Sequence, residues 1–177
     1  MDKITTIIEN TIWTVDGFLS KEQCEYYIDR IDNKTGVIPF TDSGYFKNDK
    51  YTDVQLTEYL YRKLKKTGID TDIIRANNLI MTGKYLPGDK FGLHTDTGLF
   101  YDSKTKEKTS HTLLIYLNDD LEGGETVFYD DKFNQTKIIL PKQGKALLFD
   151  ISLWHQGSEI IYGNKYWIGC EMISLMV

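Results

Sequence analysis

Several residue types are scarce in this sequence, and each scarcity argues against a class of protein. The two cysteines, Cys24 and Cys170, are far apart and in no metal-binding spacing, so we expect buried thiols in a reducing compartment, not disulfides or a zinc site. No apolar run approaches the length of a membrane span, and residues 1–4 begin no secretory leader, so we expect a cytoplasmic protein that does not contact membranes. The net charge of −5 gives no general attraction to nucleic acid.

The residues that are present are those of an ordinary globular protein. The chain has 177 residues, of which 41% are hydrophobic and 27% charged, which suits a folded domain with a sizeable core. We find no internal repeat and no linker. We therefore expect a single domain, with a helical N-terminal support over residues 1–76 and a β-rich core over residues 77–177.

Two helices are predicted near the N-terminus. Ser20 and Gln23 form a capping-box pattern, which starts the first helix. Thr52 or Asp53 caps a second helix, which ends at Gly68. The buried stripe of the second helix is expected to consist of four side chains at helical spacing: Leu56, Tyr59, Leu60 and Leu64.

Short alternating or apolar stretches predict β-strands in the rest of the chain. The predicted strands cover residues 11–18, 77–86, 90–96, 110–117, 125–130, 135–140, 145–151, 157–162 and 165–175. The Gly163-Asn164 pair predicts a tight hairpin between the last two. Residues 37–51 and 99–109 predict loops, the first with at most short strands and the second polar, basic and mobile. The fold expected is mainly β with flanking helices, in which two antiparallel sheets form a sandwich.

The segment His94-Thr95-Asp96 is the centre of a predicted metal site. Side chains two residues apart on a strand point to the same side, so His94 and Asp96 can reach one point. His155, at the end of another predicted strand, would add a second imidazole. Two imidazoles and one carboxylate on one face of an ion form the facial triad of non-haem Fe(II) oxygenases. Zinc hydrolases use similar residues, so the triad alone leaves both chemistries open.

The third histidine of the chain, His111, is excluded by strand parity. On the strand from His111 to Leu117, the face that carries Thr112 and Tyr116 is opposite to the face that carries His111. If Thr112 and Tyr116 face the site, His111 faces away from it.

Lys165 begins an otherwise apolar and aromatic last strand, ten residues after His155. One expectation is an exposed lysine beside the Gly-Asn turn. The other is a cation that pairs with the far carboxylate of a small dianion bound to the metal. Hydroxyl groups of Tyr116 or Thr112 would complete such an anion pocket.

Several segments resemble one enzyme family. They are Val15–Cys24, Tyr85–Asp96, Thr112–Asn118, Gly123–Phe128, Pro141–Phe149 and Trp154–Gly157, followed by Lys165 at the family's spacing. Together they resemble the Fe(II)/2-oxoglutarate-dependent dioxygenase superfamily, and within it the prolyl 4-hydroxylase branch.

The resemblance implies a fold, a cofactor set and a reaction. The implied fold is a double-stranded β-helix, or jelly-roll, core. The resemblance implies that His94, Asp96 and His155 bind Fe(II). It implies that Lys165 binds 2-oxoglutarate, with Tyr116 or Thr112 assisting, and that Tyr85 lies near the metal and the co-substrate. The implied reaction uses dioxygen and 2-oxoglutarate, releases succinate and carbon dioxide, and hydroxylates an unactivated C–H bond, with ascorbate as reductant.

Two positions depart from the family pattern, and both belong to the part of the family site that recognises the substrate. Many relatives have a tryptophan six residues after the 2-oxoglutarate lysine, where this chain has Glu171. The family often has an arginine before the central threonine-containing strand, where this chain has Lys108-Thr109. Glu171 shares strand parity with Lys165, which favours the cavity, but we expect a residue this close to a strand end to lie in solvent.

Three functions remain open at this point. The first is hydroxylation of a proline in a peptide or protein, for which the candidate substrate residues are Glu171, Trp167, Tyr45 and Tyr101, with Phe46, Tyr51 and Phe100 as further aromatic candidates. The second is an oxygenase that acts on a free amino acid or on a lysyl or arginyl side chain, with Glu171 and the overall acidity favouring a cationic substrate. The third is a non-catalytic jelly-roll binding module, which would not bind Fe(II) together with 2-oxoglutarate.

Overall fold

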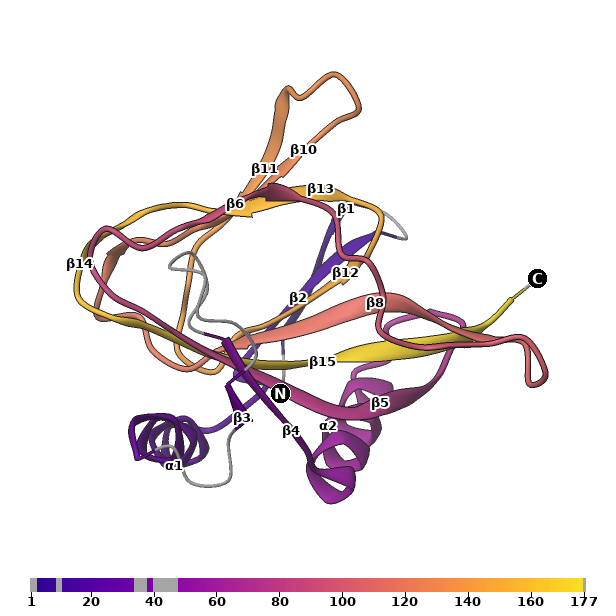
Figure 1. Cartoon of the computed structure of the whole chain (residues 1–177). Helices are drawn as coiled ribbons and strands as arrows, with labels where there is room; N and C mark the ends of the chain where they lie inside the picture. The colour runs from indigo at the N-terminus through magenta and orange to yellow at the C-terminus, as the bar shows by residue number, and fades with distance from the viewer. Residues whose placement is uncertain (1–2, 9–10, 34–37, 40–47, 177) are drawn as a thin grey trace.

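The structure is a computed structural model, and it describes residues 3–8, 11–33, 38–39 and 48–176. Helices α1 (Lys21–Asp32) and α2 (Val54–Lys66) accompany the strands of this part of the chain (Figure 1). The strands in chain order are β1 (Lys3–Ile8), β2 (Ile12–Asp16), β3 (Ile38–Pro39), β4 (Asn48–Thr52), β5 (Ile73–Tyr85), β6 (Phe91–His94), β7 (Tyr101–Asp102), β8 (Glu107–Tyr116), β9 (Glu122–Gly123), β10 (Thr126–Tyr129), β11 (Gln135–Ile139), β12 (Ala146–Asp150), β13 (Trp154–Gly157), β14 (Ile160–Tyr162) and β15 (Lys165–Leu175).

Two antiparallel sheets face each other. In the larger sheet the strand order is β1-β2-β12-β8-β15-β5-β4-β3, with β7 paired to β8, and in the smaller sheet it is β11-β10-β13-β6. Strands β14 and β9 form a separate short pair. The β10–β11 hairpin extends beyond the body of the molecule, at the top of Figure 1. This arrangement confirms the predicted fold class, mainly β with two antiparallel sheets and flanking helices.

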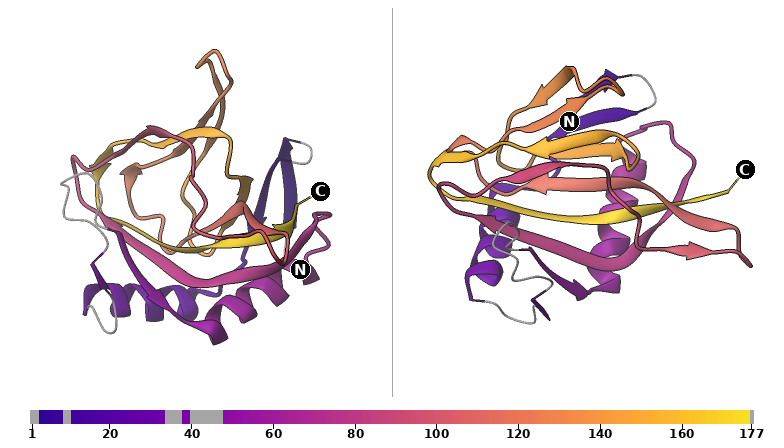
Figure 2. Two further views of the ribbon diagram at one scale, coloured as in Figure 1. Left: turned by 45° about the vertical axis from the view of Figure 1, so that its right-hand side comes forward. Right: turned by 45° about the horizontal axis from the view of Figure 1, so that its top comes forward.

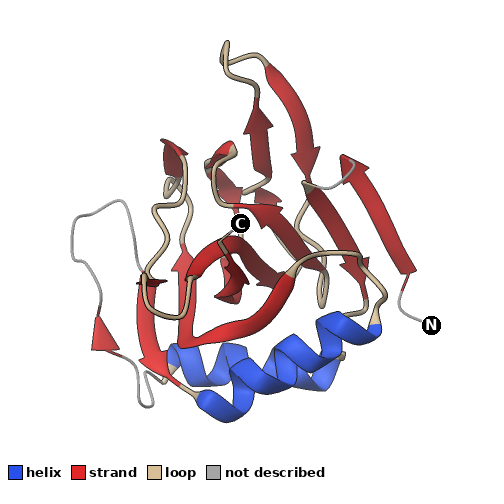
Figure 3. Ribbon diagram, turned by 90° about the vertical axis from the view of Figure 1, so that its right-hand side faces the viewer, coloured by secondary structure: helices blue, strands red, loops and turns tan. Residues whose placement is uncertain are grey.

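The two helices cover the outer face of the larger sheet, on the side away from the smaller sheet (Figures 2 and 3). The Ser20 side chain accepts a hydrogen bond from the Gln23 N–H, and the Gln23 side chain accepts one from the Ser20 N–H. Asp53 caps α2 by accepting from the Leu56 N–H, an interaction that typically contributes about 1 kcal/mol. Both predicted helix starts are therefore confirmed. Within the described residues, neither helix has the length and apolarity needed to cross a membrane.

The buried stripe of α2 is narrower than predicted. Leu56, Leu60 and Leu64 are buried against the larger sheet, and each such burial contributes about 1.5–3 kcal/mol. Tyr59 is 40% exposed, and its hydroxyl accepts a hydrogen bond from the Gln23 side chain of α1. The prediction that Tyr59 belongs to the stripe is therefore wrong.

Alternation along the central strands divides the interior into two layers. One set of residues on β8, β12 and β15 faces the helices: Leu113, Ile115, Ala146, Leu148, Tyr166, Ile168, Cys170 and Met172. The alternate set faces the smaller sheet: Thr112, Leu114, Tyr116, Leu147, Phe149, Lys165, Trp167 and Glu171. The helix-facing layer is almost entirely apolar, so the ionisable groups of these strands are concentrated between the two sheets.

The last strands pair differently from the prediction. Strand β14 pairs with β9, whereas β15 lies between β5 and β8, so the hairpin predicted from Gly163-Asn164 is wrong. Gly163 is required for another reason. It has a φ of +76°, and a Cβ at this position would lie 2.5 Å from the Asp120 carbonyl oxygen. The turn carries the chain from the short pair into the larger sheet.

Two other segments contain more strand than predicted. Residues 99–109 are a hairpin and not a loop, because β7 pairs with the start of β8. Within the first 76 residues, β1 to β4 and the start of β5 join the larger sheet, in addition to the two helices. The region 37–51 contains β3 and most of β4, in line with the short strands allowed for it.

Candidate active site

His94 and His155 lie on neighbouring strands of the smaller sheet, and Asp96 lies just beyond the end of β6. Strands β6 and β13 pair so that His94 and His155 are directly opposite, with ring centroids 4.2 Å apart. Asp96 lies two residues beyond His94, and its N–H donates to the Ile151 carbonyl at 2.9 Å. One ligand atom from each of the three residues lies within 4.8 Å of the others. The structure therefore places side by side the three residues that the sequence singles out.

Both imidazoles are oriented by a backbone carbonyl two residues earlier. Nδ1 of His94 lies 2.8 Å from the Gly92 oxygen, and Nδ1 of His155 lies 2.9 Å from the Leu153 oxygen. A carbonyl oxygen can only accept, so each Nδ1 carries the proton and each Nε2 presents a lone pair. These Nε2 atoms lie 3.4 and 3.8 Å from Oδ1 of Asp96. Two nitrogen lone pairs and one carboxylate oxygen therefore converge.

Thr112 gives the two oxygens of Asp96 different environments. Its hydroxyl donates to Oδ2 at 2.5 Å, which leaves Oδ1 to face the two Nε2 atoms. Burial alone would raise the pKa of Asp96, but His94, His155 and the Thr112 hydroxyl together hold it below its usual value. Burial lowers the pKa of His155. At neutral pH the site therefore offers a carboxylate and neutral imidazole, which are the forms that bind a metal ion.

This arrangement fits a divalent transition metal. Three atoms bound to one ion at about 2.1 Å, at right angles to one another, lie roughly 3 Å apart, so the observed separations need only small side-chain movements. Aromatic contacts hold the imidazole rings of His94 and His155 in place. The Phe91 ring stacks on His94 at 3.8 Å between centroids, and the Phe149 ring packs edge-on against His155 at 4.7 Å. Imidazole and carboxylate donors on one side suit Fe(II) and leave other coordination positions open.

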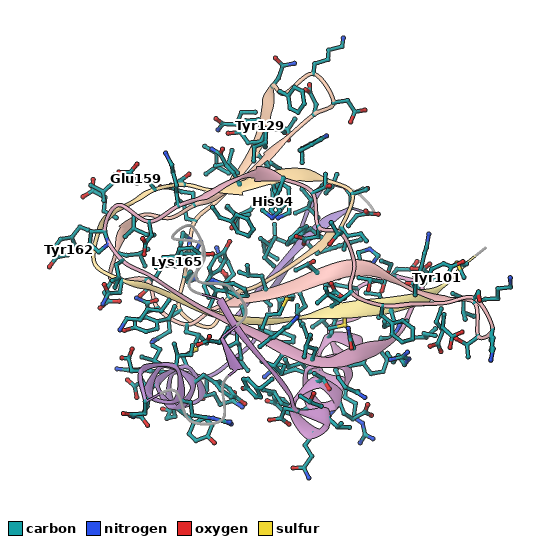
Figure 4. All side chains as sticks on the ribbon, in the orientation of Figure 1. His94, Tyr101, Tyr129, Glu159, Tyr162 and Lys165 are labelled. Atoms are coloured by element: carbon teal, nitrogen blue, oxygen red, sulfur yellow. The ribbon has the colours of Figure 1, made fainter. Side chains whose placement is uncertain are left out.

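A cavity of about 320 Å³ lies in front of these three residues. Its other ionisable wall residues include Lys165 and Glu171, both from β15. The apolar and aromatic part of the wall consists of Met81, Phe91, Leu99, Leu114, Phe149, Ile160 and Trp167. Figure 4 shows the His94 and Lys165 side chains in the space between the sheets. The cavity therefore brings the metal-site residues, a cation and an anion into one largely apolar enclosure.

Lys165 is buried, with 5% of its surface exposed. Its Nζ donates to the Gly124 carbonyl at 2.6 Å and lies 5.3 Å from the centre of the Tyr116 ring. Burial lowers the pKa of Lys165 to about 8, with Glu125 opposing this effect. The alternative of an exposed lysine is therefore wrong. A buried ammonium on a cavity wall gains by pairing with an anion.

The hydroxyl residues predicted beside Lys165 divide into two groups. Thr112 and Tyr85 lie on the cavity wall, and Tyr85 is directly opposite Lys165 in the β5–β15 pairing. Tyr116 is fully buried behind the wall, with its hydroxyl 2.6 Å from that of Thr126. Thr126 itself lines the cavity. Thr126 therefore connects the cavity wall to Tyr116 through the hydrogen bond between their hydroxyl groups.

Glu171 and Trp167 both lie on the cavity wall. Glu171 is only 5% exposed, so the expectation that it lies in solvent is wrong. The competing argument, that it shares strand parity with Lys165, is confirmed. Trp167 is 8% exposed and lies between these two positions on the same face of β15.

Of the remaining aromatic candidates, the three that the structure describes do not line the cavity. Tyr101 is 70% exposed on β7, far from His94 in Figure 4. Tyr51 belongs to the helix-facing core, and Phe100 packs under an arginine side chain. Tyr45 and Phe46 lie outside the described residues.

The exclusion of His111 is confirmed. Its ring lies 5.8 Å from that of Trp13, and its Nδ1 lies 2.9 Å from the Ser110 hydroxyl. It is buried outside the cavity described above.

Two groups near Lys165 lie outside the predicted set. Thr126 could have been identified from the alternation of the predicted strand at 125–130, because it shares a face with the inward Phe128. The Gly124 carbonyl, which accepts from Lys165, is a backbone atom with no side-chain signal in the sequence.

Comparison with known proteins gives a family match over half of the chain. The model of the 2OG-Fe(II) oxygenase superfamily matches residues 80–170. Probable prolyl 4-hydroxylase 10 of Arabidopsis thaliana is 28% identical in an alignment 187 residues long, gaps included, which covers 85% of this chain and 64% of the plant protein. The chain thus spans slightly less than two thirds of the length of that relative.

Solved structures of low sequence identity show the same fold. The viral collagen prolyl hydroxylase vCPH from Paramecium Bursaria Chlorella virus-1, in its 2OG complex, has a TM-score of 0.65 and 22% identity, covering 94% of this chain and 98% of its own. A prolyl hydroxylase from Trichoplax adhaerens, in complex with a hypoxia inducible factor oxygen degradation domain peptide fragment, has a TM-score of 0.64 and 14% identity, covering 94% and 84%. The jelly-roll architecture expected from the sequence is therefore shared with these proteins.

Proposed function

This chain belongs to the 2OG-Fe(II) oxygenase superfamily, and from that premise we propose that it is an Fe(II)- and 2-oxoglutarate-dependent dioxygenase that hydroxylates an unactivated C–H bond of a peptide. One observation carries the proposal. His94, Asp96 and His155 converge on the wall of a cavity that also contains the buried Lys165. A triad alone would also suit a hydrolase, whereas a buried cation on the same wall suits a co-substrate with a free carboxylate.

The metal would be held by Nε2 of His94, Nε2 of His155 and Oδ1 of Asp96. When bound, Fe(II) supplies the activation of dioxygen that couples decarboxylation of 2-oxoglutarate to hydroxylation of the substrate. The chain's part is orientation. The Gly92 and Leu153 carbonyls fix the tautomer and direction of both imidazoles, and Thr112 directs one carboxylate oxygen away from the metal.

Lys165 would bind the far carboxylate of 2-oxoglutarate. Its ammonium donates to the Gly124 carbonyl, and an ammonium group carries two further N–H donors. The Thr126 hydroxyl, backed by Tyr116, is available beside it. Leu114, Phe149 and Trp167 line the cavity and would exclude water around the bound groups, which strengthens each charged interaction.

The proposed substrate is a peptide, with proline as the residue to test first. Support comes from the relatives, whose names describe prolyl hydroxylases, and from the Trichoplax protein, which was solved with a peptide. The 2-oxoglutarate chemistry rests on the family and the site, whereas proline rests on those names. Glu171, at a position where relatives often have tryptophan, is a candidate for contacting the substrate.

A turnover assay tests the proposal. The protein is supplied with Fe(II), 2-oxoglutarate, ascorbate and peptides containing proline, lysine or arginine, and succinate and oxygen-bearing peptide products are measured by mass spectrometry. We expect succinate to form only when Fe(II) and 2-oxoglutarate are both present, and one peptide class to gain an oxygen atom. Lys165→Met should abolish the response to low 2-oxoglutarate.

The two competing readings predict different results in the same assay. A non-catalytic binding module would form no succinate with any peptide. A metal hydrolase would cleave substrate without consuming 2-oxoglutarate. Either result would overturn the proposal.

A further inference from the structure

Glu171 is a buried carboxylate on the cavity wall, and within the described residues its hydrogen-bond partners are neutral groups. Both of its oxygens accept from the Leu99 N–H, at 3.0 and 2.9 Å. Oε2 also accepts from the Thr109 hydroxyl at 2.8 Å and from the Asn77 amide at 3.4 Å. In the described part of the chain, the ion pairs formed by lysine, arginine and histidine involve other carboxylates.

The hydrogen bonds of Glu171 are distributed unequally between its oxygens. Oε2 receives all three donors, whereas Oε1 receives only a share of the Leu99 N–H. A carboxylate has about four acceptor positions, so Oε1 retains the capacity for another donor. Because Glu171 lines the cavity, a bound molecule can supply that donor.

Glu171 and Lys165 lie far apart on the same face of β15, and both line the cavity. Glu171 is the cross-strand partner of Thr112, whose hydroxyl donates to Asp96. Lys165 is six residues earlier on β15, which corresponds to roughly 20 Å along the strand. A dianion between Lys165 and the metal would leave the Glu171 end of the cavity for the substrate.

Among Fe(II), 2-oxoglutarate, Asp96, Lys165 and Glu171, the charges leave Glu171 without a counter-charge. Asp49, Lys50 and Lys90 also line the cavity, but they are more exposed than Glu171. The two positive charges of Fe(II) would balance the two negative charges of 2-oxoglutarate, and Lys165 would balance Asp96. Glu171 would then retain one buried negative charge. Neutral donors reduce the cost of burying such a charge, but an ammonium or guanidinium group lowers it further.

We propose that Glu171 forms a subsite for a side-chain cation of the peptide substrate, that of a lysyl or arginyl residue. This deepens and rests on the proposed function, because it assigns the Glu171 end of the same cavity to the substrate. The cation would donate to Oε1, while Oε2 keeps its bonds to the Leu99 loop and to Thr109. The same carboxylate would thus hold the loop that follows Asp96 and select the charge of the substrate.

Paired peptides test the subsite. Each pair has one sequence, with lysine in one member and Nε-acetyl-lysine in the other, or arginine in one and citrulline in the other. Binding is measured by calorimetry on the anaerobic protein loaded with Fe(II) and 2-oxoglutarate. We expect the cationic member to bind at least about ten-fold more tightly, as a charge-assisted hydrogen bond requires. In Glu171→Gln this preference should fall to about one-fold.

Asp49→Asn is the matched control, because Asp49 is another carboxylate on the same cavity wall and its loss changes the net charge equally. It should retain most of the preference for the cation. Equal loss in both variants, or equal weakening of both peptide members in Glu171→Gln, would mean that Glu171 acts only through net charge or only as a loop support, and would overturn the subsite. The absence of any preference in the unaltered protein would do the same.

The failure of the subsite can be separated from the failure of the proposed function. Succinate formation from 2-oxoglutarate without peptide reports the oxygenase chemistry alone. If succinate forms and no cation preference exists, the subsite is wrong and the oxygenase remains. If no succinate forms, but the preference for the cation exists and depends on Glu171, the oxygenase function is wrong and the cation subsite remains.

Discussion

The two ends of β15 bury opposite charges in different ways. At one end the Lys165 ammonium donates to the Gly124 carbonyl, and burial lowers its pKa to about 8. At the other end the Glu171 carboxylate accepts from Leu99, Thr109 and Asn77. The comparison indicates that the lysine end is stabilised only when a ligand arrives, whereas the glutamate end is already part of the framework. The metal-site residues lie across the cavity from this strand.

The largest effect should come from removing a ligand of the proposed metal site, which lies across the cavity from β15. His155→Ala removes one of the three proposed ligands, and even residues that only orient ligands typically cost 10–100-fold in metal affinity or activity. We expect Fe(II) affinity and 2-oxoglutarate turnover each to fall by more than about 100-fold. Isothermal titration with Fe(II) and a succinate assay measure the two quantities.

His111→Ala is the control for this change. His111 is also buried, but it packs against Trp13 outside the cavity. Its replacement should lower the free energy of unfolding and leave Fe(II) affinity intact. A comparable loss of Fe(II) affinity in both variants would contradict the assignment of the ligands.

The lysine end should determine the affinity for 2-oxoglutarate. Truncating one partner of a buried, hydrogen-bonded charge pair typically costs 2–5 kcal/mol, so Lys165→Met should raise the KM for 2-oxoglutarate by about 30-fold or more. Fe(II) affinity measured without 2-oxoglutarate should change little. A KM within about three-fold of the unaltered protein would place the co-substrate elsewhere.

The pH dependence of co-substrate binding should follow the lysine. Lys165 has a pKa of about 8, lowered from 10.5 by burial, and only its protonated form pairs with a carboxylate. The apparent affinity for 2-oxoglutarate should therefore be constant below pH 8 and fall by about ten-fold per pH unit above it, until the pKa of the complex is reached. Lys165→Arg keeps its charge in this range and should remove the decline. A decline of equal steepness in Lys165→Arg would assign it to another group.

The smallest effects should be on stability, and the two ends should respond with opposite signs. Lys165→Met removes a poorly paired buried cation, so it should raise the free energy of unfolding by about 1 kcal/mol or more at pH 7. Glu171→Ala leaves one buried donor, Thr109, and two part-buried donors, Leu99 and Asn77, without this acceptor, and should lower that free energy by at least about 1 kcal/mol. Denaturant unfolding in the absence of metal and 2-oxoglutarate measures both. Changes of the same sign would remove the distinction between the two ends.

The sequence predicts best those features that depend on neighbouring residues. The caps at Ser20 and Asp53 and the alternation along β15 follow from short patterns, and all are present. The alternation of side chains along one strand also excluded His111 from the metal site. This argument needs no knowledge of how the strand pairs with others. The same argument favoured a cavity position for Glu171, and the opposing argument from its place near a strand end was the weaker one.

Features that depend on distant pairing are not readable in this way. A Gly-Asn pair indicates that the chain turns, but it does not indicate that β14 pairs with β9 and β15 with β5 and β8. Tyr59 has the spacing of a buried residue, yet it is 40% exposed and its hydroxyl accepts a hydrogen bond from Gln23 on the distant helix α1. The Gly124 carbonyl reaches Lys165 because of the path of the chain, which no side-chain pattern encodes.

We propose that one cavity binds Fe(II) and 2-oxoglutarate together through His94, Asp96, His155 and Lys165. An anaerobic titration of the protein with Fe(II) and then 2-oxoglutarate, followed by visible absorption, tests this claim most directly. We predict a charge-transfer band that appears only when both are present, is absent in His155→Ala and requires much more 2-oxoglutarate in Lys165→Met. A protein that binds Fe(II) and shows no response to 2-oxoglutarate would contradict the account.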